Sequence, residues 1–181
     1  MGKAGMFLRH LLSIVILPGT VAVVVPIWIA RRNQIAFTAP ATALDAALVA
    51  AGALALAGGL VLFAASLARF VTEGRGTLAP WDPPRHLVVR GPYRYVRNPM
   101  ISGVIFITLG EALILRSRPH AAWALTFVLM NVTWIPLYEE PTLEATFGND
   151  YREYRRHVRR FIPRLRPYQP TSPATTAARS T

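Results

Sequence analysis

The chain of 181 residues is 52% hydrophobic, has a mean hydropathy of +0.33 and is only 16% charged, well below the roughly 25% of a typical soluble domain. This composition excludes an ordinary soluble protein and indicates an integral membrane protein of the all-α class. We attribute the net charge of +11 to arginines that meet anionic lipid headgroups, rather than to nucleic-acid binding. Because cysteine is absent, disulfides, thiolate catalysis and cysteine-ligated metals are excluded.

Four apolar runs predict membrane-spanning helices, given about 1.5 Å per helical residue and a hydrocarbon core of about 30 Å. The first is not followed by a small-x-small cleavage site, so we interpret it as a retained anchor. The second contains small residues typical of closely packed membrane helices, among them Gly52, Gly58 and Gly59. The third is short. The four runs cover residues 11–29, 44–70, 101–115 and 121–138.

The distribution of positive charge predicts the orientation of these spans. Sixteen of the 20 lysines and arginines fall on one side of the four-span arrangement. Cytoplasmic loops of membrane proteins carry an excess of lysine and arginine. We therefore predict a bacterial-type inner or plasma membrane protein with both termini, and the loop before Gly91, in the cytoplasm.

Local signals predict where the last two spans and the following helix begin and bend. Asn98 and Pro99 predict the start of the third span, because asparagine can cap a helix and proline suits its first turn. Pro136 predicts a bend near the end of the fourth span. Beyond it, apolar residues at steps of three or four, opposite a face of arginines, predict an amphipathic helix over about 142–162 that lies on the membrane, with a break at Gly148.

The composition of the last residues predicts a disordered tail over 167–181, which is rich in proline, serine, threonine and alanine. The rest of the chain, residues 1–166, is then a single transmembrane domain.

An acid pair, Glu139 and Glu140, follows the fourth span. Two interpretations stay open. The acids either form an interfacial pair that balances the charge of nearby arginines, or lie near Tyr93 and Arg97 and bind a cationic or hydroxyl-rich cosubstrate. Glu111, inside the third span, requires a buried partner or a polar cavity. The four histidines are too scattered to predict a metal site.

Five motifs, in their order and spacing, resemble the membrane methyltransferase superfamily. This superfamily includes isoprenylcysteine carboxyl methyltransferases and phospholipid N-methyltransferases, with many bacterial relatives. The resemblance covers about residues 72–163. The motifs are Arg85-His86-Leu87-Val88, Gly91-Pro92-Tyr93, Arg97-Asn98-Pro99, Glu139-Glu140 and Phe147-Gly148-x-x-Tyr151-x-x-Tyr154.

The resemblance implies an enzyme that uses S-adenosylmethionine without a Rossmann domain. The cofactor would lie in a cytoplasmic pocket made by the last two spans and the helix after them. Arg97 and Glu139 are the candidates for a catalytic role. The implied cofactor contacts are Arg85, His86, Leu87, Val88, Tyr93, Asn98, Pro99, Met100, Ile101, Glu139 and Glu140.

The implied substrate is a lipid or a small lipid-like amphiphile at the cytoplasmic leaflet. No arginine directly precedes Glu139, which argues against prenylcysteine as the methyl acceptor. The acceptor atom, the number of methyl transfers, the general base and the oligomeric state stay open. Two alternatives stay open as well: an NADPH-dependent membrane reductase related to sterol reductases, and a non-catalytic membrane module.

Overall fold

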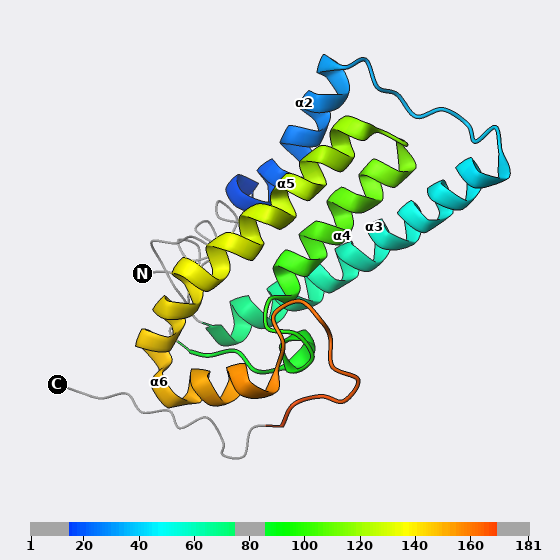
Figure 1. The fold of residues 1–181 in the computed structure, drawn as a ribbon. Helices are drawn as coiled ribbons and strands as arrows, with labels where there is room; N and C mark the ends of the chain where they lie inside the picture. The colour runs from blue at the N-terminus through cyan, green and yellow to red at the C-terminus, as the bar shows by residue number, and fades with distance from the viewer. Residues whose placement is uncertain (1–14, 75–85, 170–181) are drawn as a thin grey trace.

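The computed structural model describes residues 15–74 and 86–169, in which the regular elements are helices and no strand occurs. Three helices, α3 (Ala43–Arg69), α4 (Pro99–Ile114) and α5 (Arg118–Trp134), run side by side, with α2 (Val25–Arg32) against the upper part of α5 (Figure 1). Helix α6 (Glu140–His157) turns away from the end of α5 and crosses below the bundle. The all-α prediction agrees with this architecture.

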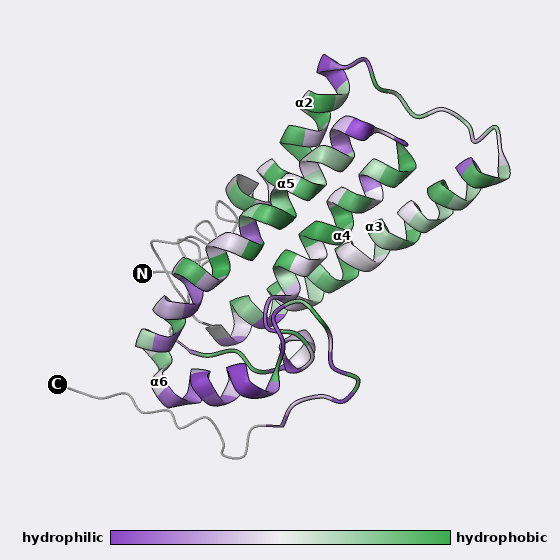
Figure 2. Ribbon diagram, viewed as in Figure 1, coloured by the Kyte–Doolittle hydropathy of each residue, from purple (hydrophilic) through white to green (hydrophobic). Residues whose placement is uncertain are grey.

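Two helices in the described part of the chain are long and apolar enough to cross a membrane. They are α3 with its π-helical continuation η2 (Phe70–Gly74) and the long helix of residues 118–157 that begins with α5. Only 11% and 17% of the residues in their apolar windows are buried inside the protein, so most of these side chains face outward, as lipid-exposed helices require. Figure 2 shows apolar residues along the bundle, and hydrophilic ones on α6, on the segment after it and near the ends of the other helices.

The other two predicted spans are helical but do not meet the same test. Helix α4 is apolar and has 16 residues. The first predicted span appears as the π-helix η1 (Val15–Val24) followed by α2, while residues 11–14 lie outside the described residues. The total of four spans stays a prediction.

Glycines bring α3 and α4 into close contact at two levels. A Cβ atom on Gly59 would lie 2.7 Å from the carbonyl oxygen of Gly103, and a Cβ on Gly52 would lie 2.8 Å from that of Gly110. Only a residue without a side chain fits at these positions. The predicted close packing is therefore correct for Gly52 and Gly59, but wrong for Gly58, where a Cβ would meet nothing within 4 Å.

The start of α4 at Pro99 agrees with the prediction, but Asn98 does not cap it. Its side chain makes no capping hydrogen bond, and its carbonyl oxygen instead accepts a hydrogen bond from the Ser102 hydroxyl at 3.0 Å. Helix α5 starts three residues before the predicted position, because Ser117 caps it. The predicted bend at Pro136 is the π-helical turn η4 (Ile135–Glu139).

Helix α6 differs from the predicted amphipathic helix in two ways. It ends at His157 instead of residue 162, although Gly148 breaks it as predicted, with φ of 56°. Its apolar face packs against the protein instead of being left free for the membrane. Tyr151 and Tyr154 pack in a buried cluster with Val158 and Tyr168, against which Leu87 and Val89 also pack. An amphipathic face needs an apolar partner of any kind, and here the protein itself supplies it.

Residues 158–169, which we call the C-terminal strap, run back along the loop before α4. The backbone nitrogens of residues 97 and 98 donate to the carbonyl oxygens of Arg159 and Arg160 at 2.9 and 3.2 Å. The nitrogens of Arg164 and Tyr168 donate to the carbonyls of residues 95 and 94, both at 2.9 Å. The predicted disordered tail therefore starts too early, because Tyr168 is buried. Residues 170–181 lie outside the described part of the chain.

Candidate functional site

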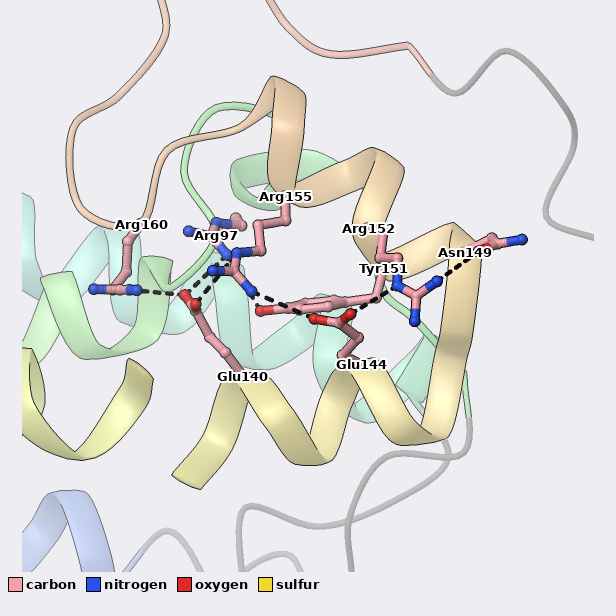
Figure 3. Close-up of polar contacts among 8 residues, drawn as sticks. All are labelled: Arg97, Glu140, Glu144, Asn149, Tyr151, Arg152, Arg155 and Arg160. Atoms are coloured by element: carbon pink, nitrogen blue, oxygen red, sulfur yellow. Dashed lines mark hydrogen bonds and ion pairs between the residues drawn. The ribbon is translucent and has the colours of Figure 1, made fainter. Parts of the chain in front are cut away.

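Glu140, the first residue of α6, is the centre of a buried charge cluster. Its side chain is 2% exposed, and its Oε1 lies 2.9 Å from Arg97 Nη1 and 2.8 Å from Arg160 Nε (Figure 3). Its Oε2 lies 3.6 Å from Arg155 Nε. Burial would raise the pKa of this carboxyl, but the three arginines outweigh burial and lower its pKa. Glu140 is therefore a buried carboxylate matched by several cations.

Two tyrosines of α6 fix the other side of this cluster. Arg97 Nη1 donates to the Tyr151 hydroxyl at 3.2 Å. The Tyr154 hydroxyl donates to the carbonyl oxygen of Tyr93 at 2.6 Å, which holds the 3₁₀ turn η3 (Gly91–Arg94) against α6. Burial raises the pKa of Tyr151 to about 12, so this side chain stays neutral and acts only as a hydrogen-bonding group.

Three buried polar atoms in this region have no hydrogen-bond partner among the described residues. They are the Tyr93 hydroxyl, Arg97 Nε and Glu140 Oε2, the last of which keeps only its longer ion pair with Arg155. A buried polar atom without a partner costs about 1–3 kcal/mol. Two donors and one acceptor thus remain available where the loop before α4 meets α6.

Glu139, the last residue of η4, is half-buried beside this cluster. Within the described ranges its carboxylate forms no hydrogen bond or ion pair. Burial and the negative charge of Glu140 raise its pKa, and the charges of Arg160 and Arg97 oppose that shift only in part. Burial, and then the charge of Glu139, raise the pKa of Tyr93. The structure thus brings Glu139 and Tyr93 close enough to interact electrostatically.

The remaining predicted contacts lie at varying distance from this cluster. Pro99 is buried and begins α4, with Met100 and Ile101 half-buried behind it. Leu87 packs against the tyrosine cluster of α6 and Val88 is buried. Asn98 contacts the strap through its backbone. His86 is exposed, and Arg85 lies outside the described residues.

Two cavities, of about 260 and 210 Å³, open elsewhere on the bundle, and none of the predicted cofactor contacts lines either of them. The first lies near the turn between α4 and α5 and includes Arg116 and Arg118. The second lies beside Gly58 and Phe106. A cofactor pocket between the acid pair and Tyr93 therefore stays a prediction, as do the individual contact residues.

Sequence reasoning did not identify three members of the cluster, Tyr151, Arg155 and Arg160. Tyr151 belongs to one of the quoted motifs, so its presence in the motif was an available signal. The two arginines were interpreted as part of a face that meets lipid headgroups. Nothing in their spacing distinguishes them from Arg156 and Arg159, which form no ion pair with the described residues.

Fold and site together define a membrane protein of the all-α class, with a buried charge cluster where the helix bundle meets α6. The phospholipid methyltransferase family matches residues 47–150, more than half of the chain. The chain therefore belongs to the phospholipid methyltransferase family and is a membrane methyltransferase. No curated protein and no solved structure matches it. The family match gives no support to the reductase alternative, and it ends before Arg155, Arg160 and the strap.

Proposed function

We propose that this methyltransferase uses S-adenosylmethionine and methylates a lipid or a small amphiphile at the cytoplasmic leaflet. The observation that carries the proposal is a group of buried polar atoms, on Tyr93, Arg97 and Glu140, that have no hydrogen-bond partner within residues 15–74 and 86–169. They lie beside the half-buried Glu139. A polar ligand with both donors and acceptors would complete their hydrogen bonds.

The chemistry of these residues fits S-adenosylmethionine. The cofactor has an amino group and ribose hydroxyls, which suit a carboxylate such as Glu139, and a carboxylate, which suits the donors Tyr93 and Arg97. When bound, it would supply an electrophilic methyl group on a positively charged sulfur. The contribution of the protein is then to align the acceptor and to exclude water, which is catalysis by positioning.

The contacts of the acid pair assign different roles to its two members. Both oxygens of Glu140 face arginines, at 2.8 to 3.6 Å, so Glu140 is a positioning residue that holds Arg97. Among the residues that the structure describes, the carboxylate of Glu139 is not paired in this way, and we assign it the direct contact with the cofactor. This assignment differs from the resemblance, which implied that both acids contact the cofactor.

The position of the site relative to the membrane supports a lipid-like acceptor. Trp134 and Tyr138 precede the acid pair, are exposed, and stack with ring centroids 4.4 Å apart. Exposed aromatic residues at the end of a span mark the boundary between hydrocarbon and water. The charge cluster would then lie at the depth of lipid headgroups, and the positive-inside distribution of lysine and arginine supports the cytoplasmic leaflet.

Equilibrium binding to the purified protein in detergent tests the cofactor. We expect S-adenosylmethionine to bind and NADPH not to bind. Glu139→Gln should weaken binding about tenfold, which corresponds to about 1.4 kcal/mol. Glu144→Gln is the matched control, because Glu144 pairs with Arg152 and Arg155 on the exposed side of α6. Failure of the folded protein to bind S-adenosylmethionine would overturn the proposal.

Radiolabelled methyl transfer into a total membrane lipid extract tests the substrate class. We expect label in an extractable lipid or amphiphile, whose identification would name the acceptor. Glu139→Gln should lose most of the transfer and Glu144→Gln should keep it. Label found only in protein would contradict the proposed acceptor class, while leaving the choice of cofactor intact.

A further inference from the structure

The C-terminal strap exposes two large apolar side chains outside the helices. Ile162 is 60% exposed and Leu165 is 100% exposed. Most other exposed large apolar residues lie on η1, α2, α3, α4, α5 or η4, where lipid would cover them. Full burial of one such side chain is worth about 1.5–3 kcal/mol, so exposure of both to water would be unfavourable.

Positive charges flank these apolar residues, and acids are absent from the segment. Between residues 158 and 169 the chain has four arginines and no aspartate or glutamate. Arg160 pairs with Glu140, whereas Arg159 and Arg166 are exposed and form no ion pair with the described residues. A segment in which exposed apolar side chains lie next to such arginines is typical of those that bind an anionic membrane surface.

The contacts of the strap place it beside the start of α4, the depth at which the predicted third span would enter the membrane. Its residues 159 and 160 bond to the backbone just before Pro99, and its residue 164 bonds to Tyr95, which is itself partly exposed. In Figure 1 the strap, in orange and red, loops out beside the lower end of α4 instead of continuing beyond α6. The strap that carries Ile162 and Leu165 therefore lies at the end of the bundle that we place at the depth of the lipid headgroups.

We propose that the C-terminal strap is a membrane-binding loop. Ile162 and Leu165 insert at the boundary between headgroups and acyl chains, and Arg159 and Arg166 contact the phosphates of anionic lipids. In this proposal the strap makes the membrane contact that the sequence predicted for the apolar face of α6, which is buried against the protein. The inference concerns membrane contact alone and does not depend on methyl transfer.

The absence of cysteine from the chain allows a probe at a single site. Leu165→Cys, labelled with an environment-sensitive fluorophore, would be reconstituted as the full-length protein into phosphatidylcholine vesicles with and without phosphatidylglycerol. We expect blue-shifted emission that lipid-borne quenchers reduce more strongly when phosphatidylglycerol is present. Ala145→Cys, exposed on α6, is the matched control and should keep the emission of a probe in water.

A second variant tests the electrostatic part of the proposal. Replacing both Arg159 and Arg166 by glutamine, in the Leu165→Cys background, should lower the quenching by lipid in anionic vesicles by about twofold or more, because each arginine near such a surface contributes about 1 kcal/mol. Unchanged quenching would overturn the assignment of these arginines. Emission at position 165 equal to that at position 145, with equal access to an aqueous quencher, would overturn the proposal as a whole.

Discussion

Replacing Glu140 by glutamine should destabilise the protein substantially. Its carboxylate is buried, and the Arg97 side chain that pairs with it at 2.9 Å is only 9% exposed. Removing one partner of a buried ion pair leaves an uncompensated charge, at a cost of about 3–5 kcal/mol. Glutamine keeps the shape and one acceptor, so we expect a loss of about 3 kcal/mol, near the lower end of that range. Arg155 and Arg160 reach solvent and add less.

The measurement is the free energy of unfolding in detergent, followed by circular dichroism, with Glu144→Gln as the control. Glu144 makes the same kind of contact with arginines, but its partners Arg152 and Arg155 are 56% and 48% exposed. Such surface pairs are worth about 0–1 kcal/mol, so the control should lose less than about 1 kcal/mol. If the two variants lose equal stability, the buried cluster does not hold the start of α4 against α6, and our reasoning fails.

Acidification offers an independent check on Glu140. Because its pKa is lower in the folded protein than in the unfolded chain, its contribution to stability is present above the ordinary glutamate pKa of about 4.3. That contribution is lost as the pH falls through the lower, folded-state pKa. Glu140→Gln should therefore weaken the dependence of stability on acid pH, and a wild-type dependence in this variant would contradict the arginine pairing.

Three further outcomes follow from other contacts. Gly59→Ala should lower the free energy of unfolding by about 1–3 kcal/mol, since its Cβ would lie 2.7 Å from the Gly103 carbonyl oxygen. Gly58→Ala should be neutral or stabilise the protein by up to about 1 kcal/mol. Equal effects of the two variants would contradict the α3–α4 contact. Tyr154→Phe leaves the buried Tyr93 carbonyl without its 2.6 Å donor and should lower unfolding free energy by about 1–3 kcal/mol, so an unchanged value would refute the role of this bond. Because the pKa of Glu139 is raised, acidification should weaken S-adenosylmethionine binding at a pH above the ordinary glutamate pKa of about 4.3. Binding titrations at several pH values measure this effect, and a wild-type affinity independent of pH would argue against Glu139 as the direct contact.

The helices of the bundle were predictable from the sequence, because apolar length and turn-forming residues are local properties. The run at 44–70 became α3, and Pro99 and Pro136 marked the start of α4 and the turn η4. A position of the acid pair near Arg97 was one of the two interpretations that the sequence left open, and the ion pair between Arg97 and Glu140 agrees with it. The resemblance placed their motifs at the same end of the bundle, and charges of opposite sign in a membrane protein tend to pair.

The contacts of the chain after α6 were not predictable in the same way. An amphipathic pattern shows that one face needs an apolar partner, but not whether lipid or protein supplies it, so Tyr151 and Tyr154 were assigned to the wrong environment. The strap pairs through backbone groups, which leave no pattern in the sequence. Because this backbone pairing is what brings Arg160 to Glu140, the sequence could not distinguish Arg160 from the arginines around it.

The order of residues along the chain bears on how the protein is made. A ribosome synthesises every helix in the described part of the chain before it reaches residue 158. The spans can therefore enter the membrane while Glu140 still lacks Arg160, and while the backbone nitrogens of residues 97 and 98 lack the carbonyl groups that later accept their hydrogen bonds. Completion of the charge cluster is then a late event in biogenesis. A translation product that stops between α6 and the strap should insert into the bilayer, but its charge cluster around Glu140 should remain incomplete at the proposed cofactor site.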